Sequence, residues 1–343
     1  MRRRRAGIVF LALMLIAGLA AGLAQPRSTG KCNRPHPCVT TTVTIPTTTT
    51  PPAPAPGGAP YDAASAWNTP IPVDAPINAR SLAFITAIAD NGLPLTSDPA
   101  QYTIAVYEFD ASTPLVPVRG SGFYSTYDDG DNSRVGHGSP WTELLPIPAT
   151  AQAPPGTDGQ VVLLDRARGI EYGLWQFGRR SDGSVTATNA YRYHTTAGYY
   201  GRFGDGLAGR GAGMPYLAGL VRPWELAQGR IDHALAFAYD SPSAEFVYPA
   251  SKSDGGKFHG VSGLDLPEGS RLQLDPALTE TGFDRFGLSE PARVIARALQ
   301  TYGMYVVDHS GSSKVYVEYS GTPGAVSRDA LSRIPWSEFR VVS

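Results

Sequence analysis

The sequence of 343 residues contains only 2 cysteines, Cys32 and Cys38, and both lie near the N-terminus. The long remainder of the chain must therefore hold its core together without a disulfide. In an oxidising compartment, two cysteines at C-x5-C spacing most simply form a local disulfide that closes a small loop. A metal site that also uses His36 is the alternative, although it would lack a fourth ligand.

Long apolar runs are also missing, except at the N-terminus. There, the basic residues Arg2 to Arg5 precede an apolar run from Ile8 to Ala20, and the small residues Gly22-Leu23-Ala24 follow. This order is typical of a secretory signal peptide, which we predict over residues 1–24. An uncleaved N-terminal anchor is the alternative, because alanine and glycine extend the apolar run. No later segment is apolar enough to cross a bilayer, so the protein is predicted to be secreted or associated with the cell envelope.

An excess of basic residues is lacking as well. The chain has 29 Lys+Arg against 30 Asp+Glu, for a formal net charge of −1. Removal of residues 1–24 takes away four arginines and no acid, which leaves a charge of −5 on the mature chain. Proteins that bind nucleic acid carry a basic surface, so no nucleic-acid partner is expected.

Shifts in composition predict the domain organisation. Residues 25–39 form a short segment around the predicted Cys32–Cys38 loop, and residues 40–60 are rich in threonine and proline. Proline-rich sequence is extended and builds no core, and the threonines suit O-linked sugar, so residues 40–60 are predicted to be a semi-rigid linker. Residues 61–343 remain, enough for one large globular domain or two closely joined ones.

Residues 61–343 are predicted to be mainly β, with a β-sandwich or jelly-roll-like domain and a few packed helices. Glycine and proline are frequent, strong helical runs are few, and the apolar segments are short and rich in β-branched and aromatic residues. Residues 165–171 are predicted to be a tight hairpin between two strands. The predicted strands are Thr103–Phe109, Val116–Arg119, Gln160–Asp165, Glu171–Phe177, Val185–Tyr193, His233–Tyr239, Glu245–Tyr248, Ser270–Leu274, Met304–Asp308, Lys314–Tyr319 and Glu338–Val342.

Helices are predicted where apolar residues recur at helical spacing. The clearest runs from Ser289 to Tyr302, because Ser289 can cap it, Pro291 suits its first turn and Gly303 stops it. Asn78 to Asn91 is predicted to be a second helix, and Pro223 to Ala227 a short helical turn.

Several catalytic motifs are missing. The sequence has no G-x-S-x-G elbow, no H-E-x-x-H, no phosphate-binding loop and no dinucleotide fingerprint. Asp128 to Asn132 is an acidic turn, but its spacing does not match a calcium-binding EF-hand loop, which favours a solvated turn over a calcium site. No cofactor and no metal are expected.

Aromatic residues lie beside polar ones in several places, an arrangement that suits the apolar faces and hydroxyl groups of sugar rings. Ordinary packing of aromatic rings in a β protein is the alternative. The residues that we predict to bind substrate are Trp67, Trp175, Tyr193, His194, Arg222, Trp224 and Glu225.

Three residues are the candidates for catalysis. His233 lies in an apolar segment, where it is either a general base or a buried neutral histidine. Asp308 and Asp254 lie at turns next to predicted strands, where each is a candidate acid or base, although the turns alone explain both residue types. Asp232 is predicted to point to the opposite face from its neighbour His233, because side chains alternate along a strand.

Three stretches, GMPYLAGLVRPWELAQGRIDHALAF, FVYPASKSDGG and ARALQTYGMYVVDHSGSSKVYVEYSGT, resemble a group of secreted bacterial β-rich proteins of unassigned function. With SAWNTPI near Trp67, the resemblance spans most of residues 65–343. The matching positions include Arg222, Glu225, His233 and Asp308. The resemblance implies one common domain and adds weight to His233 and Asp308, but it assigns no catalytic roles.

Two functions fit these observations. The first is a secreted carbohydrate-active enzyme, a polysaccharide lyase or a glycoside hydrolase, that acts on an extracellular polysaccharide. In a lyase, His233 or Tyr193 would abstract a proton beside a carboxylate that Arg222 neutralises; in a hydrolase, Asp308 with Asp254 or Glu225 would be the acid and base. The alternative is a non-catalytic protein that binds a cell-envelope glycan. The enzyme hypothesis further predicts that His233 and Asp308 meet in one pocket.

Overall fold

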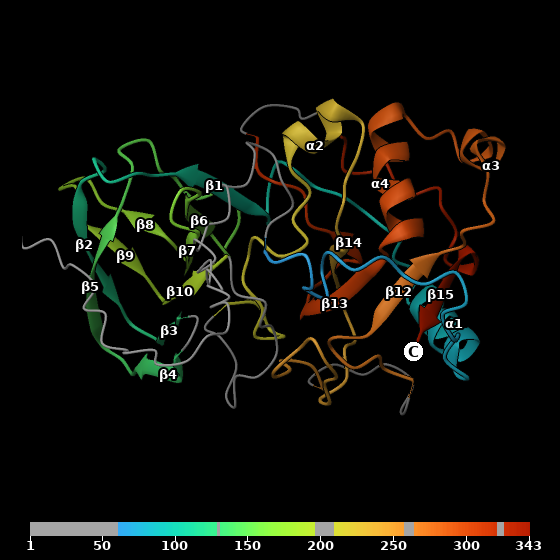
Figure 1. Ribbon diagram of the computed structural model, residues 1–343, viewed down its shortest axis with the longest axis horizontal. Helices are drawn as coiled ribbons and strands as arrows, with labels where there is room; N and C mark the ends of the chain where they lie inside the picture. The colour runs from blue at the N-terminus through green and yellow to red at the C-terminus, as the bar shows by residue number, and fades with distance from the viewer. Residues whose placement is uncertain (1–60, 129–130, 196–208, 257–263, 321–325) are drawn as a thin grey trace, which may run out of the picture. The chain divides into compact units, whose positions relative to one another are not determined.

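The computed structural model describes residues 61–128, 131–195, 209–256, 264–320 and 326–343, all of which belong to one compact unit. The predicted signal peptide, cysteine loop and linker lie outside these residues. The described chain is mainly β with a few packed helices, as predicted. Figure 1 shows β1–β10 and β11–β15 as two groups of strands, with helices packed beside the second group.

The strands form three sheets. In spatial order, the six-stranded sheet is β1 (Ile104–Glu108), β6 (Gln160–Asp165), β7 (Ile170–Trp175), β10 (Asn189–His194), β3 (Tyr124–Asp128) and β4 (Asp131–His137). The four-stranded sheet is β5 (Trp141–Pro146), β2 (Leu115–Gly120), β9 (Val185–Ala187) and β8 (Gly178–Arg179). The five-stranded sheet is β14 (Lys314–Val315), β11 (Leu235–Tyr239), β13 (Met304–His309), β12 (Arg271–Leu274) and β15 (Phe339–Val342).

The six-stranded and four-stranded sheets pack face to face as a sandwich. Side chains alternate between the two faces of a strand, and β6 shows the consequence clearly. Val161 and Leu163 join a core cluster with Val118 of β2 and Val185 of β9. This cluster is the interior of the predicted sandwich.

The opposite face of the six-stranded sheet packs toward the five-stranded sheet. Val162 and Leu164 of β6 share a second core cluster with Ala236 of β11 and Val307 of β13. The loop from Ala212 to Leu220 contributes further buried residues to the same cluster. Residues from both of these sheets also line the candidate functional site.

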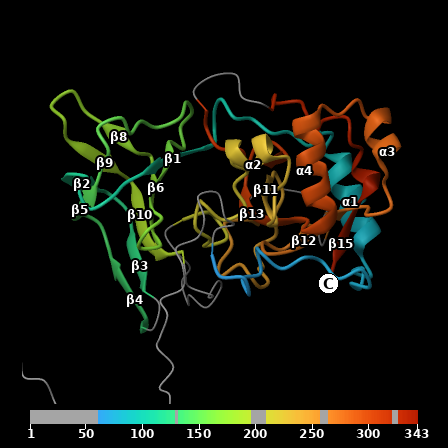
Figure 2. The same cartoon turned by 45° about the horizontal axis from the view of Figure 1, so that its top comes forward.

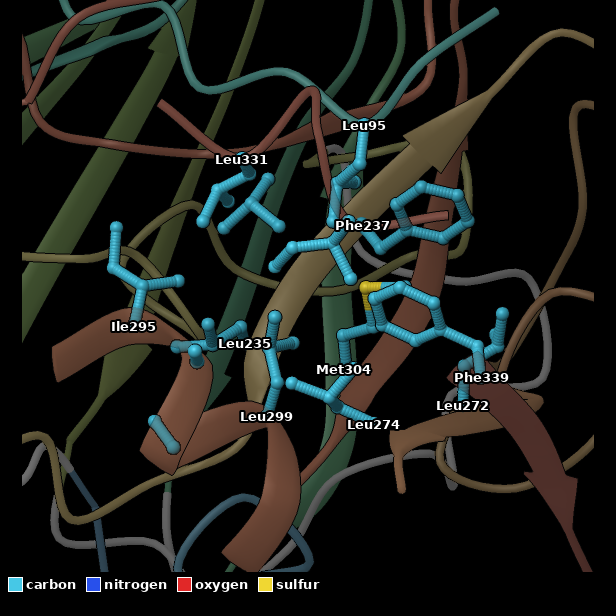
Figure 3. Close-up of a cluster of buried hydrophobic side chains, with 14 of the residues drawn as sticks. Leu95, Leu235, Phe237, Leu272, Leu274, Ile295, Leu299, Met304, Leu331 and Phe339 are labelled. Atoms are coloured by element: carbon cyan, nitrogen blue, oxygen red, sulfur yellow. The ribbon is translucent and has the colours of Figure 1, made fainter. Parts of the chain in front are cut away.

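Helices cover the remaining face of the five-stranded sheet (Figure 2). Leu235 and Phe237 of β11 and Met304 of β13 share the third core cluster with Ile295 and Leu299 of one helix (Figure 3). The four α-helices among the described residues are α1 (Ser81–Asp90), α2 (Pro223–Gln228), α3 (Glu280–Arg285) and α4 (Glu290–Thr301), and a short 3-10 helix spans Trp336–Glu338.

The end of α4 shows how the sequence directs this packing. Gly303 has a φ of 65°, a left-handed conformation that favours glycine. A Cβ there would lie 2.3 Å from the carbonyl oxygen of Leu272, so only glycine lets the chain turn directly from α4 into β13. The prediction of a helix stopped by Gly303 and followed at once by a strand is confirmed.

The other predicted elements agree with the structure only in part. The hairpin that joins β6 and β7 is confirmed, with Asp165 opposite Ile170. The predicted strand Val185–Tyr193 is two strands, because the chain leaves the four-stranded sheet after β9 and enters the six-stranded sheet as β10. Glu245–Tyr248 is not a strand and makes only an isolated bridge between Phe246 and Glu268. Lys314–Tyr319 is regular only over β14.

Candidate functional site

A cleft of about 600 Å³ is lined by residues from the six-stranded and the five-stranded sheets. Its volume lies within the ~300–1,000 Å³ typical of ligand sites. One side is formed by the ends of β6, β7 and β10, including Trp175 and Asn189. The other side is formed by the end of β13 and by β14, together with the segment that carries Asp254.

Asp254 and Asp308 come together in this cleft. The two carboxyl groups meet at Gly211, where an added Cβ would lie 2.4 Å from Asp254 Oδ1 and 2.8 Å from Asp308 Oδ1. Both side chains are partly accessible from the cleft. The prediction that these two residues belong to one site therefore has a geometric basis. The contact between them needs a glycine at position 211, which the sequence alone does not indicate.

Backbone and side-chain donors hold both carboxylates in place. The backbone N–H of His309 donates to Asp254 Oδ1 at 3.2 Å, and that of Gly211 donates to Asp308 Oδ1 at 3.2 Å. Tyr316 Oη donates to Asp308 Oδ2, also at 3.2 Å. Because β13 delivers both Asp308 and the His309 amide, one strand end fixes the positions of the two acids.

Burial raises the pKa of Asp308 to about 7, and repulsion by the neighbouring Asp254 carboxylate adds to this effect. Arg210, Lys314 and the Gly211 amide oppose the shift but do not cancel it. Near neutral pH, a substantial fraction of Asp308 therefore carries a proton beside the Asp254 carboxyl group. A carboxyl group that keeps its proton near neutral pH is suited to act as a general acid.

A third carboxyl group supports Asp254 from within the protein. Glu268 is fully buried, and burial followed by the adjacent Asp254 raises its pKa to about 10. Glu268 is therefore neutral at pH 7 and places a protonated carboxyl next to Asp254. It does not line the cleft.

Two buried cations lie beside the acids. The Arg210 guanidinium lies 4.8 Å from the centre of the Tyr316 ring, and Lys314 Nζ lies 4.6 Å from it. Arg210 also donates to the carbonyl oxygens of Pro215 and Tyr216, at 3.1 and 2.8 Å. Burial lowers the pKa of Lys314, and the attraction of Asp308 opposes that shift. Both cations are held in place by the protein, and both act to lower the pKa of Asp308.

Aromatic and amide side chains complete the walls. Trp175 and Tyr102 line the cleft with Gln160 and Asn189. Tyr216 also lines it, and burial raises the pKa of its hydroxyl well above the ordinary value, so that it stays protonated. The cleft therefore offers flat rings and neutral hydrogen-bonding groups around a pair of acids.

His233 lies elsewhere, and the prediction that it meets Asp308 is wrong. His233 precedes β11, whereas Asp308 lies near the end of the parallel strand β13, opposite Ala238. His233 lies five residue steps before Ala238, which corresponds to about 16 Å along the chain at ~3.3 Å per residue. His233 Nε2 instead pairs with Glu225 Oε1 at 3.0 Å, and both side chains are buried.

Arg222, Glu225 and His233 form a buried cluster at the start of α2. The Arg222 backbone N–H donates to Glu225 Oε2 at 2.9 Å, and the Arg222 side chain pairs with Glu318. Burial lowers the pKa of His233, but the charge and hydrogen bond of Glu225 outweigh this and raise it overall. The structure thus brings these three predicted residues together, away from the cleft lining.

The remaining predicted substrate-binding residues do not line the cleft, apart from Trp175. Trp67 is fully buried and packs edge-on against Tyr305, with ring centres 5.1 Å apart. Tyr193 is fully buried in the second core cluster. His194 is half-buried at the end of β10, and Trp224 is half-buried in α2. For Trp67 and Tyr193, ordinary aromatic packing explains the residue type.

Sequence reasoning missed several residues of the site, among them Tyr102, Arg210, Glu268 and Lys314. Of these four, only Lys314 gave a local signal, as a cation that opens a strand of alternating polar and apolar residues. The other three come from loops or from isolated bridges, where no periodic pattern indicates which way a side chain points.

Comparisons with protein family models, curated proteins and solved structures found no match for this chain. The resemblance to secreted bacterial proteins therefore remains a prediction. Within the described ranges, no group of three or more His, Cys, Asp or Glu side chains is arranged to hold a metal ion. Among the same residues, no helix is both long and apolar enough to span a membrane.

Proposed function

We propose that this protein is an exported glycoside hydrolase that acts on an extracellular polysaccharide, with Asp308 as the general acid and Asp254 as its partner carboxylate. The observation that carries the proposal is the meeting of these two carboxyl groups at Gly211, inside a cleft lined by aromatic and amide side chains. The arginine-rich N-terminus followed by an apolar run supports export.

Hydrolysis of a glycosidic bond needs one protonated and one ionised carboxyl group. Asp308, with a pKa of about 7, can donate its proton to the departing sugar oxygen. Asp254 Oδ1 and Asp308 Oδ1 lie 2.4 and 2.8 Å from one shared point, so they are no further apart than the ~5–5.5 Å found in retaining glycosidases. The proposed mechanism is therefore retention, in which Asp254 attacks the anomeric carbon and water later releases the sugar.

A lyase mechanism has less support. The residues assigned to it from the sequence, His233, Tyr193 and Arg222, do not line the cleft. Tyr216 and Tyr316 do line it, but burial raises the pKa of each hydroxyl, which leaves very little of either in the phenolate form that a base requires. Asp254 and Asp308 do line the cleft, which favours hydrolysis over a lyase reaction.

The test is incubation of the purified protein with a panel of polysaccharides, followed by assays for new reducing ends and for the ultraviolet absorbance of lyase products. We expect new reducing ends without new absorbance. Asp308→Asn and Asp254→Asn should each lower the rate by at least about 100-fold, as expected for loss of an acid–base or nucleophilic group. Asp232→Asn is the matched control, because Asp232 pairs with Arg230 at the surface.

Three results would contradict the proposal. New absorbance would indicate a lyase. Full activity in Asp308→Asn would show that Asp308 is not the general acid. Binding of a polysaccharide without any product would indicate the non-catalytic glycan-binding protein instead.

A further inference from the structure

Tyr102 is the most exposed aromatic ring of the cleft, and its backbone is strained. The residue is 44% exposed and lines the cleft. Its φ is 48°, a left-handed conformation that bulky side chains rarely adopt. Strain of this kind persists only where the surroundings enforce it, and it concentrates at functional sites.

The surroundings of Tyr102 hold this conformation in three ways. Its backbone N–H donates to the carbonyl oxygen of Pro155 at 2.8 Å. Its own carbonyl oxygen accepts from Lys314 Nζ, also at 2.8 Å. Its ring packs so closely on Gly156 that a Cβ there would lie 2.8 Å from the ring. Tyr102 is thus a rigidly held ring at the wall of the cleft.

The same contacts connect Tyr102 to the acids. Lys314 Nζ lies over the ring of Tyr316, and Tyr316 Oη donates to Asp308 Oδ2 at 3.2 Å. Only two side chains, Lys314 and Tyr316, therefore separate the Tyr102 backbone from Asp308. The position of the ring relative to the acid pair is fixed by the protein.

We infer that Tyr102 is a sugar-binding platform, on which the apolar C–H face of a neutral pyranose ring stacks beside the bond to be cleaved. The position of this platform beside a cleaved bond rests on the proposed function, whereas the binding of a sugar to Tyr102 does not. The face of an aromatic ring is electron-rich and attracts the weakly positive C–H groups of a sugar rather than the carboxylate of a uronic acid. Half-buried Trp175, which packs on the core, leaves less of its ring available.

The test is affinity electrophoresis in gels that contain xylan, mixed-linkage β-glucan, galactomannan or alginate. We expect at least one of the three neutral polysaccharides to retard the wild-type protein. Tyr102→Asn removes the ring while asparagine tolerates a positive φ, so its dissociation constant should rise at least about tenfold. Tyr102→Phe keeps the ring and should bind as the wild type does. Phe123→Ala is the control, because Phe123 is 62% exposed and does not line the cleft.

The outcomes separate this inference from the proposed function. Unchanged binding by Tyr102→Asn, or no retardation of the wild type by any neutral polysaccharide, would overturn the platform. Retardation that Tyr102→Asn loses, in a protein that cleaves nothing, would support the platform and contradict the hydrolase. Cleavage with an unchanged KM in Tyr102→Asn would support the hydrolase and overturn the platform. Circular dichroism and thermal melting of Tyr102→Asn establish that any loss of binding is not a loss of fold.

Discussion

At the scale of single residues, the site depends on carboxyl groups that sit closer together than their charges favour. Asp254 lies between Asp308 and the buried Glu268, and the pKa values of both neighbours are raised, chiefly by burial and then by Asp254. Two of the three acids can therefore keep a proton near neutral pH. Asp254, which contacts both of these acids, is the carboxyl group that we propose as the nucleophile.

Glu268 makes this arrangement costly at high pH. Its pKa is about 10 in the folded protein against an ordinary value of 4.5, so the folded state holds a proton that the unfolded state has lost. Stability must then fall as pH rises between these two values. We predict that Glu268→Gln, which cannot ionise, melts at a higher temperature than the wild type at about pH 9 and differs little at about pH 5. Thermal melting followed by circular dichroism measures this, and parallel curves for the two proteins would contradict it.

At the scale of elements, α2 owes its position to a buried contact between Glu225 and His233 and not to its length. The helix spans only Pro223–Gln228, too short to be stable alone. Glu225 in its first turn reaches back to the Arg222 backbone and across to His233, just before β11. This contact fastens α2 to the start of a strand inside the five-stranded sheet.

Removal of His233 should therefore affect folding and not chemistry. We predict that His233→Ala lowers the free energy of unfolding by about 3–5 kcal/mol, because it leaves the buried Oε1 of Glu225 without its hydrogen bond to His233, while Oε2 keeps only the Arg222 amide. Asp232→Ala, which breaks the exposed pair with Arg230, should cost less than about 1 kcal/mol. Denaturant titration measures both. A small loss in His233→Ala combined with abolished turnover would restore the catalytic hypothesis for this histidine.

At the scale of the whole molecule, the sequence predicted the fold class and the elements with a clear period. The short apolar run of β6 and the apolar stripe and glycine stop of α4 are local features, so they can be recognised without knowledge of the fold. The sequence could not predict that β9 and β10 belong to different sheets, because that depends on which strands are available as partners. It also carried no sign of α3 or of β3, β4 and β5.

The site shows the same limit. Asp254 and Asp308 could be named from their turns, but their contact depends on Gly211, whose missing side chain leaves room for both. His233 was attractive because it interrupts an apolar segment. That feature also suits a buried partner for Glu225, and only the register of β11 against β13 separates it from the acids.

The central claim is that Asp308 donates a proton to the departing sugar oxygen with Asp254 beside it, and the pH dependence of kcat/KM tests it most directly. The polysaccharide cleaved in the panel is the substrate, and the rate of reducing-end release is measured for the wild type and for Lys314→Met. We predict that wild-type activity falls above about pH 7, as Asp308 loses its proton. Lys314 lowers the pKa of Asp308, so its removal should shift this fall to higher pH. Wild-type activity that keeps rising above that pH, or a fall that Lys314→Met leaves in place, would contradict the account.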